Sequence, residues 1–345
     1  MPPIVLRAAA LSLAALACAT LAQAADYRAP RNAFGHPDLQ GVWTNASLTS
    51  VERPGNFKTL VIPEAEAVAF ETRRAVMRAA QDTPTDPNAP APPSGADVGG
   101  YNAVWTDPGT ALGRIKGEVR TSWLIDPADG KLPYSAAGRK AFETQLAFVR
   151  GTFDGPESRP LGERCILGFG STAGPPMLNV LYNNNYQIVQ TADQVAIVVE
   201  MNHDARIVRL GGQHLPAHIR PWMGDSIGRW EGDTLVVETT NFNPGENLRP
   251  YFGATIYISE RAKVIERFTR VSPTQILYGF TVDDPATYTQ AWRAEMPLTA
   301  SPGPVYEYAC HEGNYSLPGI LAGARRDEQQ GRKTEAVDIS EGEND

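Results

Sequence analysis

Apolar and polar positions alternate in a series of short segments through the second half of the chain. The alternation begins at Tyr186-Gln187-Ile188-Val189-Gln190 and continues, with polar turns such as Glu231-Gly232-Asp233, to about residue 309. A two-residue period is typical of strands that bury one face, and such turns are typical of hairpins. The pattern predicts about eight or nine strands, over residues 186–190, 194–201, 205–210, 226–230, 234–240, 264–271, 275–282, 289–297 and 305–309. A meander of this size normally closes to remove its edges, so the predicted fold is mainly β, an antiparallel meander that forms a barrel.

The region before these strands has a different pattern and predicts an irregular segment with two helices. One helix is expected from about residue 63 to 80, because Pro63 suits a first helical turn and acidic residues precede arginines along the segment. A second helix is expected after Ser135, which suits an N-cap position, to about Arg150. The remaining expected features are short strands at 39–43 and 122–126 and a loop rich in proline and alanine at 82–100.

The amino terminus has the organisation of an export signal. Arg7 supplies the positive charge, Ala8 to Leu21 is an apolar run too short to span a bilayer comfortably, and Ala22-Gln23-Ala24 fits the cleavage pattern. The protein is therefore expected to be periplasmic or secreted. Two alternatives stay open, an uncleaved membrane anchor and a lipoprotein acylated at Cys18. Acylation at Cys18 would give the protein a membrane as partner.

Net charge and cysteine content narrow the range of partners and cross-links. The chain has a formal net charge of −8, and removal of Arg7 with the signal leaves −8 − 1 = −9. An acidic chain without a basic stripe argues against a nucleic-acid partner. Loss of Cys18 leaves Cys165 and Cys310, and two thiols in an exported protein most simply pair. This disulfide would stabilise the fold by on the order of 4 kcal/mol, and two separately buried thiols are the alternative.

The composition predicts four regions along the chain. The last region is polar and acidic, so it cannot bury enough apolar surface to order itself. The predicted regions are a signal peptide (1–24), an irregular and helical segment packed on the barrel (25–180), the barrel-like domain (181–321) and a disordered tail (322–345).

Several segments resemble a family of secreted bacterial proteins of mostly unassigned function. The longest is GDSIGRWEGDTLVVETTNF at residues 224–242, and others are Glu163-Arg164-Cys165-Ile166 and Cys310-His311-Glu312-Gly313-Asn314-Tyr315. This resemblance covers nearly the whole mature chain, implies a shared fold and supplies no reaction. The strand series also resembles lipocalin-like barrels, which hold apolar small molecules, and that second resemblance is architectural only.

Two histidine segments are candidates for chemistry. His214 and His218 are four residues apart, a spacing that places two imidazoles on one face of a helix, as in zinc sites. Pro216 argues against a regular helix, so we prefer a structural or pocket-lining role and expect no metal. His203-Asp204, with Arg206 nearby, resembles a general base oriented by a carboxylate, although an ordinary hairpin turn explains the same residues and is preferred.

Charged and aromatic residues at two further places are candidates for binding. Arg220-Pro221-Trp222-Met223-Gly224-Asp225 places a guanidinium, an indole and a carboxylate in one loop. There Trp222 would form an apolar wall while Arg220 or Asp225 orients a polar group. A loop pinned by an Arg–Asp pair is an equal alternative. In the strand around Glu266, either this residue or Arg267 shares a face with large apolar neighbours, and an interior charge there must be paired or functional.

Cys310-His311-Glu312 is the preferred catalytic segment, because a disulfide would hold the backbone beside a titratable pair. A conventional cluster at a strand end, around the disulfide, is the alternative. The candidate catalytic residues are His311, Glu312, His218, Arg220 and Asp225. The candidate ligand-binding residues are Trp222, His214, Glu266, Arg206, His203 and Trp292.

The sequence lacks the motifs of the common nucleotide-dependent chemistries. It contains no phosphate loop or dinucleotide fingerprint, so no organic cofactor is expected. The favoured hypothesis is an exported enzyme that performs lyase, isomerase or hydratase chemistry on a small, largely apolar molecule. The alternatives are a non-catalytic carrier of such a molecule and an envelope interaction protein.

Overall fold

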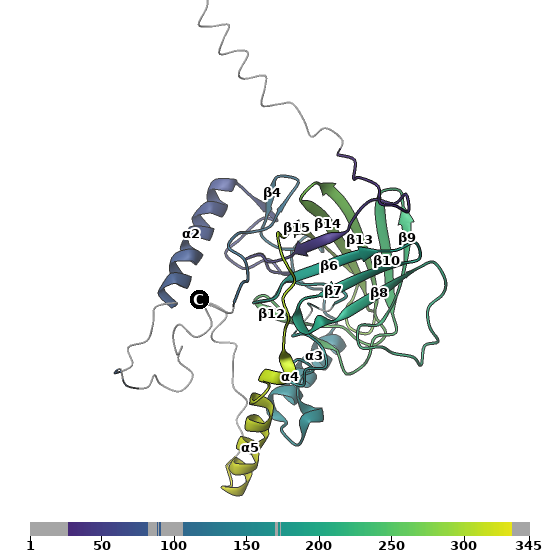
Figure 1. Ribbon diagram of the computed structural model, residues 1–345. Helices are drawn as coiled ribbons and strands as arrows, with labels where there is room; N and C mark the ends of the chain where they lie inside the picture. Colours follow the sequence, from purple (N-terminus) through teal and green to yellow (C-terminus); the bar gives the residue numbers. More distant parts are fainter. Residues whose placement is uncertain are drawn as a thin grey trace, which may run out of the picture.

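The computed structural model describes residues 27–81, 88, 90, 106–169, 172 and 174–332. The expected signal peptide, most of the loop at 82–100 and residues 333–345 of the expected tail lie outside these ranges. Within them the protein is mainly β, with a closed barrel surrounded by a few helices (Figure 1). The predicted barrel-type fold is confirmed.

Nine of the described strands close the barrel, because the N-terminal strand pairs on both of its sides. Trp43 lies opposite Ala300 on one neighbour and opposite Tyr186 on the other. The expected strand near residue 43 therefore joins the two ends of the strand series and leaves no open edge. In order around the barrel, the strands are β1 (Gly41–Thr44), β6 (Asn185–Gln190), β7 (Gln194–Val199), β8 (Ala205–Leu210), β9 (Asp225–Glu231), β10 (Thr234–Thr240), β13 (Lys263–Ser272), β14 (Gln275–Asp283) and β15 (Trp292–Ala300).

One pair of barrel strands departs from the predicted antiparallel meander. Strands β8 and β9 are parallel, with Val208 opposite Ser226. Parallel neighbours need a connection that returns to the end where the first strand began. Residues 211–224 form this connection, so the expectation of purely antiparallel pairing is wrong at this pair. The return places most of the predicted site loop at the end of the barrel where β8 starts.

The two predicted N-terminal helices are confirmed as α2 (Glu64–Gln81) and α3 (Ala136–Gly151). The Ser135 hydroxyl caps α3, because it accepts a hydrogen bond from the Gly138 amide at 2.9 Å. The same hydroxyl donates to the Thr287 carbonyl at 3.0 Å and so ties the helix to the barrel side. Other described elements are β2 (Val61–Ile62), β3 (Arg114–Ile115), β4 (Glu118–Arg120), β5 (Leu124–Asp126), the 3-10 helices η1 (Pro156–Ser158) and η3 (Met201–His203), and the unpredicted hairpin β11 (Leu248–Tyr251) and β12 (Ala254–Tyr257).

The C-terminal part differs from the predicted final strand and tail. Residues 305–309 form no strand and lead instead into α4 (Cys310–Gly313) and α5 (Ser316–Gln329). The two helices lie beside α3 at one end of the barrel (Figure 1). The predicted boundary at residue 321 falls inside α5, so the expectation of disorder is wrong for residues 322–329.

Side chains occupy the interior of the barrel. Along β14 the buried positions alternate, and Tyr278 and Phe280 contact each other inside with ring centroids 5.3 Å apart. The segment 177–180 is also buried, and the Met177 amide donates to the Tyr278 hydroxyl at 3.0 Å. The barrel is therefore filled in this region by the protein itself, unlike the ligand-holding lipocalin-like barrels that the strand series resembles.

A cavity of about 310 Å³ lies near the end of the barrel where β14 begins and β15 ends. Its lining comes from Ser47, Gln275, Thr299 and the segment 109–114. Arg114 in this lining is already engaged by Glu64 and Glu71, with a closest contact of 2.5 Å to Glu64. The cavity therefore contains no unpaired acid or base among the residues that line it.

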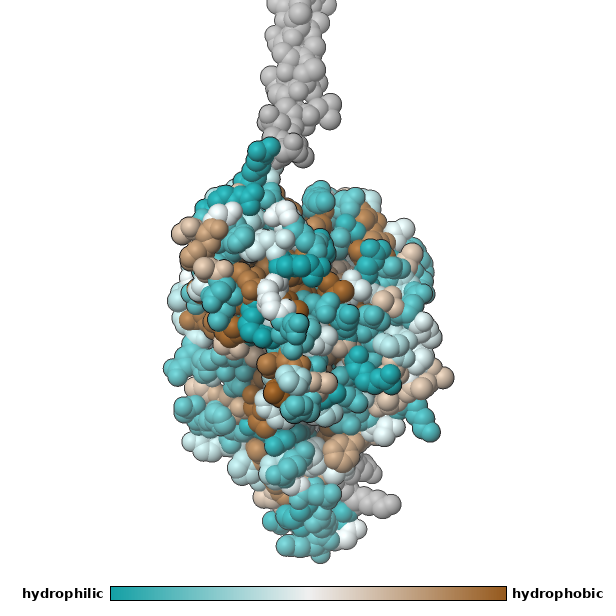
Figure 2. All heavy atoms as spheres, turned by 90° about the vertical axis from the view of Figure 1, so that its right-hand side faces the viewer, coloured by the Kyte–Doolittle hydropathy of each residue, from teal (hydrophilic) through white to brown (hydrophobic). Residues whose placement is uncertain are grey.

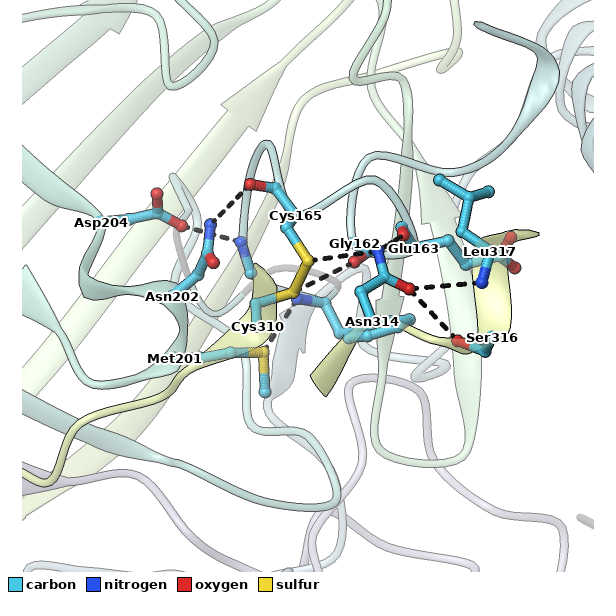
Figure 3. The surroundings of a disulfide bond; sticks show 12 residues. Gly162, Glu163, Cys165, Met201, Asn202, Asp204, Cys310, Asn314, Ser316 and Leu317 are labelled. Atoms are coloured by element: carbon cyan, nitrogen blue, oxygen red, sulfur yellow. Dashed lines mark hydrogen bonds between the residues drawn. A yellow bond between two sulfur atoms is a disulfide. The ribbon is translucent and has the colours of Figure 1, made fainter. Parts of the chain in front are cut away.

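The predicted disulfide between Cys165 and Cys310 is confirmed (Figure 3). Their Cα atoms are 5.7 Å apart, and 145 positions of sequence separate the two residues. The bond attaches α4 to the segment before the buried stretch 174–180, and it is consistent with export. In the described part of the chain, every helix is too short or too polar to cross a bilayer.

Candidate functional site

Most of the predicted site residues gather at one end of the barrel, which we call the disulfide end. It is the end where β8 and β9 begin and β10 ends. The connection 211–224 returns to this end and is fastened there, because Arg220 donates to the Phe242 carbonyl at 3.0 Å. Trp222 packs against the following turn, since a Cβ atom on Gly245 would lie 3.0 Å from its indole. The disulfide lies at the same end, where Asn202 donates to the Cys165 carbonyl (Figure 3).

Arg206 and Glu266, both predicted as ligand-binding residues, form a buried ion pair inside the barrel. Two guanidinium nitrogens of Arg206 contact the two carboxylate oxygens of Glu266 at 2.5 and 2.9 Å. The Tyr278 hydroxyl also donates to Glu266 at 2.7 Å. A buried charge pair with this many hydrogen bonds is stable when left intact. The pairing agrees with the expectation from the sequence that a charge inside the barrel is paired or functional.

A second buried ion pair, Arg249 with Glu246, is incomplete. Both side chains are buried, and the shortest distance between their charged atoms is 3.4 Å. Arg249 Nη1 donates to the Pro175 carbonyl. Within the described structure, its Nε and Nη2 atoms and Glu246 Oε2 have no hydrogen-bond partner. Unpaired buried polar atoms are rare in native proteins and mark strain, chemistry or a bound group.

Two carboxyl groups at the disulfide end hold protons unusually tightly. Burial raises the pKa of Glu246 to about 7, and the nearby Asp204 adds to the rise while Arg249 opposes it. Burial also raises the pKa of Asp204 to about 6, although a hydrogen bond from the Gly168 amide favours its ionised form. That bond is 2.8 Å long (Figure 3). The protein thus places two carboxyls that titrate near neutral pH within electrostatic reach of each other, and one of them, Glu246, lies beside the Arg249 guanidinium.

His214 and Asp225 form a second group at the base of the connection. His214 Nδ1 lies 2.8 Å from Asp225 Oδ2, and Nε2 lies 3.4 Å from Glu238. Burial disfavours ionisation of Asp225, but bonds from the Leu215 amide and His214, together with the Arg209 charge, give a lowered pKa. Asp225 therefore acts as a fixed negative charge that anchors the connection. The expected pairing of Arg220 with Asp225 is wrong, because Arg209 pairs with Asp225 at 2.8 Å while Arg220 donates to backbone carbonyls.

The structure separates the other predicted residues from these groups. His311 and Glu312 are exposed on α4, and no hydrogen bond to either side chain is found within the described ranges. His218 is exposed, and Trp222 is 36% exposed at the surface. Trp292 is fully buried in the aromatic core.

His203 lies at the disulfide end and binds the C-terminal segment. Its Nε2 atom accepts a hydrogen bond from the Tyr308 amide at 3.3 Å. Glu200 accepts from the Tyr306 amide at 3.1 Å and from Asn185 at 2.8 Å. These bonds hold the segment that leads to the disulfide. The predicted role of His203 as a turn residue is compatible with this placement, since its φ is +54°.

Sequence reasoning missed Glu246 and Arg249. Glu246 belongs to the polar turn Asn243-Pro244-Gly245-Glu246-Asn247, which has the composition of a surface loop. Its burial depends on contacts with distant segments, so no local pattern revealed it. Asp204 was considered as the carboxylate that orients His203, but the turn interpretation was preferred to it.

Neither a metal site in the described residues nor a similar protein indicates the function of the chain. Among the described residues, no group of three or more histidine, cysteine, aspartate or glutamate side chains is arranged to hold a metal ion. No family model, curated protein or solved structure matches the chain. The resemblance to a family of secreted bacterial proteins stays a prediction from the segments quoted above.

Proposed function

We propose that the protein is an exported acid–base enzyme that acts without an organic cofactor on a small, largely apolar molecule at the disulfide end. The observation that carries this proposal is the placement of Glu246 and Asp204. Glu246 is buried and Asp204 is partly buried, both have a pKa raised to near neutrality, and they lie close enough to influence each other. Perturbed carboxyl groups of this kind are typical of general acids and bases.

The two carboxyl groups support lyase, isomerase or hydratase chemistry. In its protonated form Glu246 donates a proton to the substrate, while ionised Asp204 removes a proton from another position. In an isomerisation the two transfers balance, and the enzyme returns to its starting state after proton exchange with solvent. Arg249 stabilises negative charge that develops beside Glu246.

Transfer of solvent deuterium tests this function. A panel of small terpenoid, steroid and aromatic alkenes, ketones and alcohols is incubated with the protein in D2O, and masses are followed by mass spectrometry. We expect deuterium incorporation with the wild type, and a decrease of roughly 100-fold or more in Glu246→Gln and Asp204→Asn, the usual size of an acid–base contribution.

Glu307→Gln, which changes an exposed carboxyl on the C-terminal segment, is the matched control and keeps the wild-type rate. The same assay with His311→Ala tests the residue that the sequence favoured, since loss of exchange there would move the site to α4. Equal exchange in the wild type, Glu246→Gln and Asp204→Asn would contradict the proposal.

The envelope interaction alternative has separate support. The barrel interior is filled, and on the outer face of β6–β8 the side chains of Val189 and Ile207 are 39% and 45% exposed. Both lie opposite Ala196, so they form one apolar stripe across three strands. Figure 2 shows hydrophobic atoms exposed between polar ones on one side of the molecule. This alternative, like that of a carrier, predicts no deuterium incorporation.

A further inference from the structure

Among the described residues, the buried pairs Arg206–Glu266 and Arg249–Glu246 differ in how many of their polar atoms have a hydrogen-bond partner. Glu266 uses both carboxylate oxygens for Arg206 and accepts a further bond from Tyr278. Glu246 reaches Arg249 only at 3.4 Å. In the first pair only Arg206 Nε lacks a partner within the described part of the chain, whereas in the second pair Arg249 Nε, Arg249 Nη2 and Glu246 Oε2 all lack one. The missing partners of Arg249 identify what the site would bind.

The edge of the Arg249 guanidinium that lacks partners has a defined shape. Nε and Nη2 lie along one edge of the planar guanidinium, and no partner for their hydrogen bonds is found among the described residues. Two parallel N–H groups on such an edge match the two oxygens of a carboxylate, which is the strongest bidentate arrangement that arginine makes. A buried guanidinium nitrogen without an acceptor is destabilising, because it has given up its hydrogen bonds to water without replacing them. A ligand that fills both positions recovers this free energy on binding.

We propose that the disulfide end binds a small carboxylate whose two oxygens accept hydrogen bonds from Nε and Nη2 of Arg249. The proposal rests on the proposed function, because it names the substrate class of the same site. The guanidinium is fully buried and lies 5.1 Å from the centre of the Phe242 ring. A ligand at this position is therefore removed from water, which favours an apolar body attached to the carboxylate.

Binding of an anion at Arg249 is coupled to the protonation of Glu246. Two ionisable groups face Glu246: Arg249 on β11, and Asp204 ahead of β8. When Glu246 is ionised it neutralises the guanidinium and repels a second carboxylate. When Glu246 is protonated, the charge on Arg249 is available to the ligand. Ligand binding above neutral pH therefore takes up a proton from the solvent at Glu246.

The experiment uses acetate and benzoate as probes, with acetamide and benzamide as neutral controls of the same shape. Isothermal titration of the full mature protein at pH 6 and pH 8, in two buffers of different ionisation enthalpy, measures affinity and proton uptake together. We expect saturable binding of the carboxylates and none of the amides. Between pH 6 and pH 8 the affinity falls by about tenfold, since Glu246 has a pKa of about 7.

Two variants make the test specific. Arg249→Lys keeps the charge but loses the planar pair of guanidinium N–H donors, so we expect carboxylate binding to weaken by at least about tenfold. Glu246→Gln keeps the shape of the side chain and leaves Arg249 uncompensated, so binding becomes independent of pH between 6 and 8. Arg261→Gln, at an exposed arginine, is the control and binds like the wild type.

Three results would overturn the proposal: equal binding of carboxylates and amides, no binding of either, or unchanged binding in Arg249→Lys. A crystal structure in which an ordered water holds Arg249 Nε and is not displaced by benzoate would also overturn it. Failure of the proposed function looks different. Carboxylate binding without deuterium transfer indicates a carrier, whereas deuterium transfer without carboxylate binding indicates an enzyme for another substrate class.

Discussion

Glu246 illustrates how burial raises the pKa of a carboxyl group until it titrates near neutral pH. Its pKa rises from 4.5 to about 7 because the folded protein removes it from water and Arg249 only partly compensates. The folded state therefore binds this proton more tightly than the unfolded chain does. The stability associated with it is fully present below about pH 4.5 and is lost as pH rises towards 7.

Glu246→Gln is expected to remove this loss, because the amide stays neutral at all pH values. Relative to the wild type, the free energy of unfolding of the variant increases by about 3 kcal/mol between pH 4.5 and pH 8. Urea unfolding at several pH values measures the difference. Glu307→Gln, at an exposed position, gives a flat difference over the same range. A flat difference for Glu246→Gln as well would show that the carboxyl is not desolvated in solution.

At the scale of elements, the sequence predicted the strands and helices that are specified by neighbouring residues. Strand β14 shows a plain two-residue alternation, and α3 has a serine at its N-cap. The hairpin of β11 and β12 was not predicted, because Leu248-Arg249-Pro250-Tyr251 has a charge and a proline where the apolar–polar alternation should continue. The parallel pairing of β8 and β9 was not predicted, because a long connection does not specify which strand the following strand pairs with.

The candidate site was less predictable than the elements that hold it. Asp225, His214 and Trp222 were found because they cluster in sequence, and the structure keeps them at one end of the barrel. Arg249 is held by the Pro175 carbonyl from a distant segment and lies over the Phe242 ring of the preceding connection. Burial of that kind is a property of the closed barrel and leaves no periodic trace in the sequence.

The N-cap of α3 gives a prediction for a single element. Ser135→Ala removes both the hydrogen bond to the Gly138 amide and the bond to the Thr287 carbonyl. We expect a loss of about 1–2 kcal/mol in the free energy of unfolding, measured in urea. Ser135→Thr retains the hydroxyl and should restore most of the stability. An unchanged value for Ser135→Ala would mean that α3 contributes little to the cooperative unit.

At the scale of the whole molecule, two long-range connections fasten the ends of the chain to the barrel. Strand β1 closes it by pairing with β6 and β15. The segment after β15 returns over the disulfide end, where its amides bond to Glu200 and His203, and ends at the disulfide. The C-terminal segment thus contacts the same region that carries Asp204. Its attachment is expected to control both stability and order at the candidate site.

Removal of the disulfide separates these two effects. In the double variant Cys165→Ser/Cys310→Ser we expect the free energy of unfolding to fall by about 4 kcal/mol, because a long loop is no longer closed in the unfolded chain. Hydrogen exchange should show lost protection at the Tyr306 and Tyr308 amides, whose bonds to Glu200 and His203 depend on the tethered segment. The amides of β13 and β14 keep their relative order of protection, since their pairing with each other is independent of that segment. An equal loss of protection in the barrel strands and in the C-terminal segment would contradict a local role for the disulfide. It would show that the disulfide stabilises the fold as a whole.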